Sequence, residues 1–414
     1  MATTDGILLS FICLICSFLI VSLLRKKAKL RHDIKHPPSP PALPFIGHLH
    51  HLSPVIHQFF HRLAQQFGPL IQICIGASTC VVASSAAVAK EIMKTHESLF
   101  TSRPKFGAAD YDIYDGYSFI TAEYGPYWRM VMSARCSGGS NEAKECRNLV
   151  MEGSELAGKL SMGDVLGPLK RFDLFGYRRK IVKLMKRFDK LVEEIMKEHE
   201  KEMKAGVKDA KDMMDILLDI HHDKSSETKL PRKGIKNIFE MFIAGTETSS
   251  TALQWTIAAL INNPIVLRKL REEIDSSVGP SRFVQESDVP NLPDLQAIVK
   301  ETLRLHTPAP LILRRCAEDC KINGREHRTA PDGHEGSSPP LHYIPFGSGK
   351  RGCPGASRAM TAIHGTLAAL AQCFDFQVDK EGIDRTIVME EGTGFTAGMK
   401  QPLICYPILR FSPL

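Results

Sequence analysis

A cysteine in a glycine-rich segment near the C-terminus is the first residue whose surroundings suggest chemistry. Cys353 lies in the sequence PFGSGKRGCPGASRAM, at the start of a predicted helix. Amides at a helix N-terminus, together with Lys350 and Arg351, favour the thiolate form of such a cysteine. A thiolate can act as a nucleophile, as a redox thiol or as a metal ligand. Glycines let the backbone approach a flat or bulky ligand, and the segment contains four of them: Gly347, Gly349, Gly352 and Gly355.

Two common interpretations of such a loop do not fit the residues present. A phosphate-binding loop continues from its last glycine with Lys and then Ser or Thr, whereas Gly352 is followed by Cys353. A cysteine protease needs a catalytic His or Asn partner, and none is evident in the sequence. Cys316 and Cys320 form another close pair, but a zinc site of this kind needs a second pair, which is lacking.

A second group of polar residues interrupts an apolar segment. Residues Ile235 to Asn262 predict a long helix that is apolar nearly all round and therefore buried, ending at Asn263 and Pro264. A carboxylate and hydroxyls inside such a helix are costly unless they are paired, so they suggest a site. In the alternative interpretation the hydroxyls bond to preceding carbonyls and the carboxylate faces water. The polar stretch runs Ala244, Gly245, Thr246, Glu247, Thr248 and Ser249.

A third pattern is an acid and a base three residues apart. Glu301 and Arg304 lie in DLQAIVKETLRLH, which has the apolar stripe of a helix. Residues at this spacing face the same way and can form an ion pair. The pattern is common, so by itself it predicts only an ordinary helical pair.

The composition indicates what kind of chain must position these residues. It has 414 residues, of which 43% are hydrophobic and 24% charged, and a net charge of +7. These values exclude a disordered or collagen-like chain, and the charge is too small to indicate nucleic-acid binding. Helical spacing at 55–66, 86–95 and 178–220 and strand-like alternation at 70–82 predict a fold of mixed α and β. We interpret the charges of 178–220 as a solvated helix face.

The N-terminus predicts a membrane anchor. Residues 7–24 carry no charge and would span about 27 Å as a helix, close to the bilayer core. The basic residues that follow at 25–31 place the rest of the chain in the cytosol. A cleaved signal peptide is the alternative, but its charge would lie on the other flank. The expected organisation is a lumenal 1–6, an anchor at 7–24, a basic and proline-rich linker at 25–53, and a globular domain at 54–414.

Taken together, the three patterns resemble the cytochrome P450 superfamily. The order Phe346, Gly349, Arg351, Cys353, Gly355 resembles its haem-binding loop, Glu301 and Arg304 resemble its ExxR motif, and 244–249 resembles its oxygen-activating helix. The anchor, the proline-rich segment and YGPYWR at 124–129 extend the resemblance. It is similar to plant microsomal members, in the branch that oxidises flavonoids and triterpenoids. The resemblance implies the cytochrome P450 fold, which is mainly helical α+β with a small β region, here incomplete and with an N-terminal transmembrane helix.

The resemblance implies a role for each motif residue. Cys353 would be the axial ligand of the iron of haem b, with Gly349 and Gly355 shaping the loop. Arg351 and Trp128 would bind the haem propionates, and Phe346 would pack beside the sulfur. Thr248 with Glu247 would relay protons to oxygen, and Glu301 with Arg304 would stabilise the core beneath the haem.

The implied activity is a haem-thiolate monooxygenase of the endoplasmic reticulum membrane. It would insert one atom of O2 into a small apolar metabolite, a flavonoid or a terpenoid, with electrons from NADPH through NADPH-cytochrome reductase. Its partners would be this reductase, the substrate, O2 and membrane lipid, but no nucleic acid. An oxygen-independent rearranging member is less favoured, because Thr248 supplies the oxygen-activating hydroxyl.

Two departures from the family pattern imply missing elements. Near 132–133, Met132 stands where the family has a basic propionate ligand, and the sequence then continues as a much later part of the fold. Between 324 and 341 the chain is almost free of apolar residues where the family places strands and a meander. A catalytically impaired, truncated or splice-variant membrane protein is therefore the alternative function.

Overall fold

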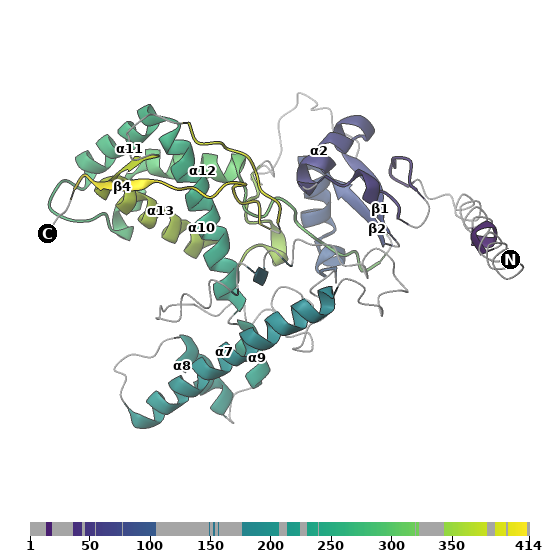
Figure 1. Cartoon of the computed structure of the whole chain (residues 1–414), viewed down its shortest axis with the longest axis horizontal. Coiled ribbons are helices and arrows are strands. Elements are labelled where there is room, and N and C mark those ends of the chain that lie inside the picture. The colour runs from purple at the N-terminus through teal and green to yellow at the C-terminus, as the bar shows by residue number, and fades with distance from the viewer. Residues whose placement is uncertain are drawn as a thin grey trace, which may run out of the picture. The chain divides into compact units, whose positions relative to one another are not determined.

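The chain divides into two compact units. One comprises Met1–Val88 with Met162–Phe172, and the other comprises Ala89–Ser161 with Asp173–Leu414. The computed structural model (Figure 1) describes residues 14–18, 36–43, 46–53, 55–76, 78–104, 149, 152–153, 156, 176–206, 213–223, 230–238, 240–318, 320–322, 343–378, 386–394 and 396–411.

The first unit contains a helix and a β-hairpin. Helix α2 (Ile56–Phe67) precedes strands β1 (Leu70–Ile75) and β2 (Ser78–Ala83), which pair antiparallel. Ile71 and Ile73 are buried, as alternation along a strand requires. The alternating run predicted at 70–82 is therefore correct in type, but it is a hairpin of two strands rather than one strand.

A buried histidine attaches the proline-rich segment to this hairpin. The Nε2–H of His48 donates to the Pro40 carbonyl at 2.9 Å, and Nδ1 accepts the Cys74 amide hydrogen at 2.8 Å. The Gln72 amide donates to the Pro38 carbonyl at 2.8 Å. Hydrogen bonds from the backbone and from the His48 ring thus fix Pro38 and His48 to β1.

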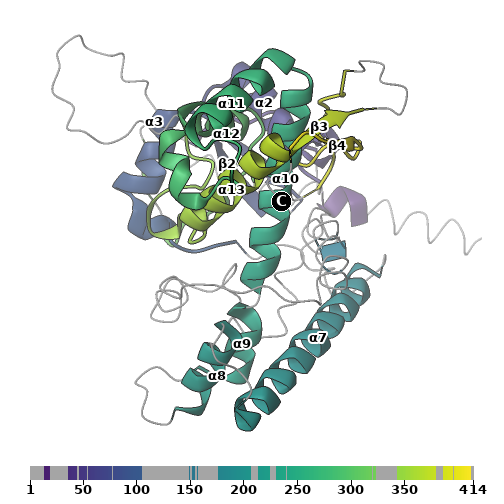
Figure 2. The same cartoon turned by 90° about the vertical axis from the view of Figure 1, so that its left-hand side faces the viewer.

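In the second unit, the predicted helix at 178–220 is two helices. Helix α7 (Tyr177–Ala205) ends at Gly206, whose left-handed backbone (φ 63°) caps the last turn. Helix α8 (Met213–His222) follows, and α9 (Arg232–Ile238) completes the group. These helices lie together in Figure 2. They share a core of buried side chains: Leu149, Leu156, Ile181, Leu184, Phe188, Leu191, Val192, Ile195, Met196, Met214, Leu217, Leu218, Leu230 and Ile235.

The polar face of α7 is not simply solvated, as had been predicted, because α9 pairs with it. Arg232 donates to Glu193 at 3.0 Å and to Glu200 at 2.5 Å, and Lys236 contacts Asp189 and Glu193 at 2.8 Å. Hydrogen bonds from Arg232 hold the pKa of Glu193 well below its usual value, at about 2. These charges connect two helices that the sequence separates.

We expect Arg232→Met to destabilise this helical group by about 1 kcal/mol near neutral pH, since the groups are partly solvated. A carboxylate whose folded-state pKa is lowered stabilises the fold above its ordinary pKa of 4.5. That contribution is lost as pH falls toward 2. The difference between wild type and variant should therefore shrink between pH 4.5 and 2 in urea unfolding followed by circular dichroism. Arg268→Met, which removes an exposed i,i+4 pair with Glu272, is the matched control and should change little.

The remaining helices of the second unit form another core. They are α10 (Glu240–Ile261), α11 (Pro264–Ser277), α12 (Pro293–Leu305) and α13 (Ala356–Cys373), with the small antiparallel sheet of β3 (Phe374–Gln377) and β4 (Tyr406–Leu409). Helix α10 contacts both α12 and α13. The architecture is mainly helical with two small sheets among the described residues, as predicted. The remaining elements of the described chain are short: η1 (Leu49–His51), α3 (Ala86–Lys90), η2 (Glu91–Thr95), η3 (Glu97–Phe100), η6 (Glu286–Asn291) and η7 (Gly349–Arg351).

The long buried helix predicted at 235–262 differs from the structure in two ways. Its residues belong to α9 and α10, with residue 239 outside the described part, and α10 ends just before Pro264 as predicted. Among the α10 side chains that the structure describes, from Ala244 onward, the deeply buried ones lie in the second half, where Trp255 donates to the Ala397 carbonyl at 2.8 Å and stacks on His306. Gly245 and Thr246 are exposed. The apolar composition therefore overstated the burial of the first half.

Most of the predicted anchor lies outside the described residues. Residues 14–18 are helical. Within the described part of the chain, no helix is long and apolar enough to cross a membrane.

Candidate functional site

Two left-handed glycines and a short helical turn shape the loop around Cys353. Gly347 (φ 71°) and Gly349 (φ 73°) adopt backbone angles that other residues rarely take. The Cys353 amide donates to the Phe346 carbonyl at 2.8 Å, which closes the loop just before α13. Cys353 is exposed, and a Cβ at Gly355 would stand 4.0 Å from its sulfur. The sulfur of Cys353 is therefore accessible and lies next to glycine backbone without side chains.

The thiol itself does not have the lowered pKa that the sequence predicted. Removal of water by the surrounding protein raises the pKa of Cys353, and only the hydrogen bond with the Gly355 backbone acts in the opposite direction. Helix α13 begins at Ala356, so Cys353 precedes the first helical turn. A cationic metal bound to the sulfur would favour the thiolate form instead.

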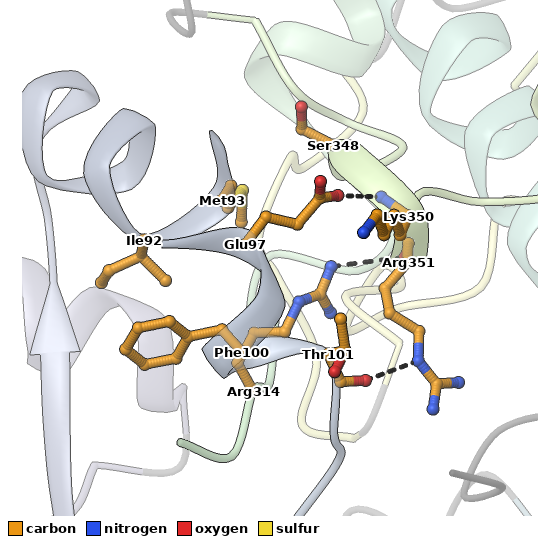
Figure 3. A pocket seen from close by; sticks show the side chains of 9 residues that line it. All are labelled: Ile92, Met93, Glu97, Phe100, Thr101, Arg314, Ser348, Lys350 and Arg351. Carbon is orange, nitrogen blue, oxygen red and sulfur yellow. Dashed lines mark hydrogen bonds between the residues drawn. The ribbon is translucent and has the colours of Figure 1, made fainter. Parts of the chain in front are cut away.

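Glu97 and Thr101 hold the other side of this loop (Figure 3). The Glu97 carboxylate accepts the Lys350 amide hydrogen, and Arg351 donates from Nε to the Thr101 carbonyl at 2.7 Å. The Arg351 side chain is only 4% exposed. Gly349 lies so close to Glu97 and to the Met93 carbonyl that a Cβ would overlap both.

We expect Gly349→Ala to disrupt this loop. The left-handed backbone costs about 1–2 kcal/mol for a residue with a Cβ, and the overlap with Glu97 and Met93 adds to that. Haem content per protein and the midpoint of thermal unfolding should both fall. Gly365→Ala is the control, because Gly365 is helical with open space around it and alanine there favours the helix. Unchanged haem content in Gly349→Ala would contradict this assignment.

Three arginines converge at this site, and two of them were missed by the sequence analysis. Arg314 donates to the Arg351 carbonyl at 3.3 Å, and Arg103 donates to the Leu313 carbonyl at 3.3 Å. Burial, followed by the positive charges of Arg103 and Arg351, lowers the pKa of Arg314 to about 10. The buried Nε of Arg103 has no hydrogen-bond acceptor within the described residues. We call Arg103, Arg314 and Arg351 the guanidinium cluster; it is suited to binding an anion such as a carboxylate.

Thr248 and Glu247 are half-buried on α10, beside exposed residues of the same helix. The Thr248 hydroxyl donates to the Ala244 carbonyl at 2.7 Å. This bond to a preceding carbonyl is the one that the alternative interpretation of the polar stretch expected. It leaves the hydroxyl oxygen able to accept a hydrogen bond. Since α10 packs against α13, the helix that follows Cys353, the two elements lie next to each other.

Glu301 and Arg304 form a two-pronged ion pair on α12, with distances of 2.8 and 2.7 Å. Each side chain is 55% exposed, so the pair lies at the surface of the described part rather than inside the core that it was expected to stabilise. The guanidinium lowers the pKa of Glu301. Within the described residues this is a surface ion pair on a helix.

Two further predicted site residues have different outcomes. Trp128 lies outside the described residues. Phe346 packs against the core of α10 to α13 and accepts the Cys353 amide hydrogen, but no described contact brings its ring to the sulfur.

The residues present fit a haem group. The exposed sulfur of Cys353, next to glycine backbone, suits the single protein ligand of a haem iron. The guanidinium cluster suits carboxylates, and haem carries two of them as propionates. This donor set defines a haem-thiolate protein. The sequence profile of the cytochrome P450 family matches residues 37–132, 128–334 and 329–406. The chain therefore belongs to the cytochrome P450 family and is a haem-thiolate monooxygenase.

Characterised plant relatives cover nearly the whole chain. It is 36% identical to cytochrome P450 93A3 and to 3,9-dihydroxypterocarpan 6A-monooxygenase, both of Glycine max, each covering 97% of this chain and 98% of the relative. It is 32% identical to beta-amyrin 24-hydroxylase of Glycine max, over 98% of both chains. These alignments run over 503 to 508 positions, more than the 414 residues of the chain. They therefore contain gaps where the relatives have residues and this chain has none.

Proposed function

We propose that this protein inserts one oxygen atom from O2 into an apolar plant secondary metabolite, a flavonoid or a terpenoid. The observation that carries the proposal is the exposed sulfur of Cys353 in a loop fixed by Glu97, Thr101 and Phe346. The names of two relatives, a pterocarpan monooxygenase and a beta-amyrin hydroxylase, support the substrate class.

In this proposal Cys353 ligates the iron of haem b, which when bound supplies the oxygen chemistry. The guanidinium cluster holds the propionates from one side, with Trp128 as a further ligand. Arg351 already donates to Thr101, so its role is shared between fixing the loop and neutralising the anion. Arg103 and Arg314 supply the further positive charge needed to neutralise both propionates.

Thr248 and Glu247 handle protons in this proposal. The Thr248 hydroxyl donates to the Ala244 carbonyl and can accept a hydrogen from a neighbouring donor. To relay a proton it must turn from that carbonyl and release its own hydrogen to oxygen as it takes the new one. Glu247 is half-buried one residue away and is the proposed partner of Thr248 in this relay. The Glu301–Arg304 pair has a positioning role on α12.

NADPH-cytochrome reductase is the proposed electron donor. Lys350 and Arg358 lie on the loop and on the first turn of α13, and Arg358 is exposed. The sequence has no acid between them, but the structure brings the Glu97 carboxylate to the Lys350 backbone. The basic surface is therefore partly neutralised, and its attraction for an acidic partner rests mainly on Arg358.

We also propose the endoplasmic reticulum membrane as the location, with a single-pass anchor at 7–24 and the catalytic domain in the cytosol. The basic residues at 25–31 are the support. A protease-protection assay on microsomes tests the orientation. If the domain resists digestion until detergent is added, it lies on the lumenal side and the proposed orientation is wrong.

A second candidate function is an impaired member of the family without turnover. The family profile matches in three pieces, whose boundaries at 128–132 and 329–334 coincide with the two departures in the sequence. Together with the gapped alignments, this supports missing elements near 132–133 and 324–341.

The experiment that separates the two functions is reconstitution of the full chain with haem, reductase, NADPH and O2. Panels of flavonoids and triterpenoids are supplied and products are identified by mass. A product one oxygen heavier than a supplied flavonoid or triterpenoid supports the monooxygenase. Haem incorporation without any product across both panels supports the impaired member.

A further inference from the structure

Two cysteines contact each other in the segment that follows α12. The sulfurs of Cys316 and Cys320 lie 3.6 Å apart, and Cys316 Sγ donates to the Glu318 carbonyl at 2.9 Å. A disulfide bond is about 2.05 Å long. The pair is therefore in the dithiol form, with the two sulfurs already in contact.

We infer that this pair is an oxidation site, at which a peroxide converts the two thiols into an intrachain disulfide. One thiolate attacks a peroxide oxygen, which breaks the O–O bond and yields a sulfenic acid and an alcohol or water. The second thiolate attacks the sulfenic sulfur, and the S–S bond forms as hydroxide leaves and becomes water. The thiols lose two electrons and two protons, and the peroxide accepts both.

The exposure of the two residues assigns their order of reaction. Cys316 is exposed, whereas Cys320 is half-buried. A dissolved peroxide therefore reaches Cys316 first, and Cys320 resolves the sulfenic acid. Such a neighbouring thiol is typical of reversible cysteine oxidation.

The backbone fixes the position of the attacked thiol. On one side of Cys316 the Arg315 amide donates to the Ser102 carbonyl at 2.8 Å, and on the other the Ala317 amide donates to the Leu99 carbonyl at 2.9 Å. Because both neighbours are held, ring closure must draw Cys320 toward Cys316. The resulting ring constrains the segment that carries Arg314, two residues before Cys316.

Another pair of cysteines in the chain provides an internal comparison. Cys74 and Cys80 lie on paired strands, but Cys74 is opposite Thr79 and Cys80 is opposite Ile73. Since successive strand residues face opposite sides, these two thiols point to opposite faces of the hairpin. They should not join under conditions that oxidise Cys316 and Cys320.

Mass spectrometry of one tryptic peptide tests the inference directly. Trypsin cuts after Arg315 and Lys321, so both cysteines fall in peptide 316–321. The reduced full-length protein is treated with hydrogen peroxide, alkylated and digested without reductant. We expect the peptide to lose both alkyl groups and two hydrogens, and to regain two alkyl groups after dithiothreitol. The reaction should be about tenfold or more faster than in urea, because the fold holds the sulfurs together.

The single variants make the test decisive. In Cys320→Ser, dimedone should trap a sulfenic acid on Cys316. Two alkyl groups retained on the wild-type peptide at peroxide doses that oxidise Cys316 in Cys320→Ser would overturn the inference. Equal rates in the folded and the urea-unfolded chain would overturn it as well.

Discussion

Cys353→Ala is expected to remove the shifted absorption band that the reduced protein shows with carbon monoxide, and with it all monooxygenase turnover. Cys353 is the described cysteine that combines exposure with a glycine-rich cradle, and alanine offers no ligand for iron.

The controls for this variant separate ligation from folding. Cys373→Ser and Cys405→Ser change other described cysteines and should keep the band. Circular dichroism of Cys353→Ala should show helix content equal to that of wild type. An unchanged band in Cys353→Ala would remove Cys353 from the haem site.

The second large effect concerns the two gaps. The 414-residue chain should retain several-fold less haem per protein than a version in which both gaps are refilled from a longer transcript. Among the described residues, Leu305, Ile404 and Leu409 are 55%, 70% and 63% exposed, and we expect the refilled elements to cover such apolar side chains. Each such side chain forgoes up to about 1.5–3 kcal/mol of burial free energy. Several of them together approach a typical stability of about 5–15 kcal/mol.

Measuring haem content and turnover of the short and the refilled chains under the same conditions tests this prediction. Refilling each gap separately shows which one matters more for retention. Equal haem content and equal turnover in the short and refilled chains would mean that the missing elements are dispensable.

Local patterns were sufficient to predict many of the elements. Alternation predicted the β1–β2 region and helical spacing predicted α2 and α12, because each pattern depends on neighbours in the sequence. The cysteine loop was predicted from residue types at fixed spacing. The break between α7 and α8 was missed, since a charged amphipathic pattern continues across Gly206.

Contacts between distant residues could not be predicted in this way. Arg351 meets Thr101 across 250 positions of sequence, and Arg103 meets Leu313 across 210. No single segment shows that these guanidinium groups converge. The α9–α7 ion pairs are missed for the same reason, and the raised pKa of Cys353 depends on burial that only the folded chain reveals.

The hydrogen bonds of Pro38 and His48 to β1 set the length of a tether. With the anchor we propose at 7–24, only residues 25–37 remain between the bilayer and the first backbone bond to the hairpin. A chain of that length, fully stretched, reaches about 45 Å. The proposed anchor would therefore keep the hairpin within this distance of the lipid surface. An apolar compound dissolved in that lipid would remain within a short diffusion distance of the first unit.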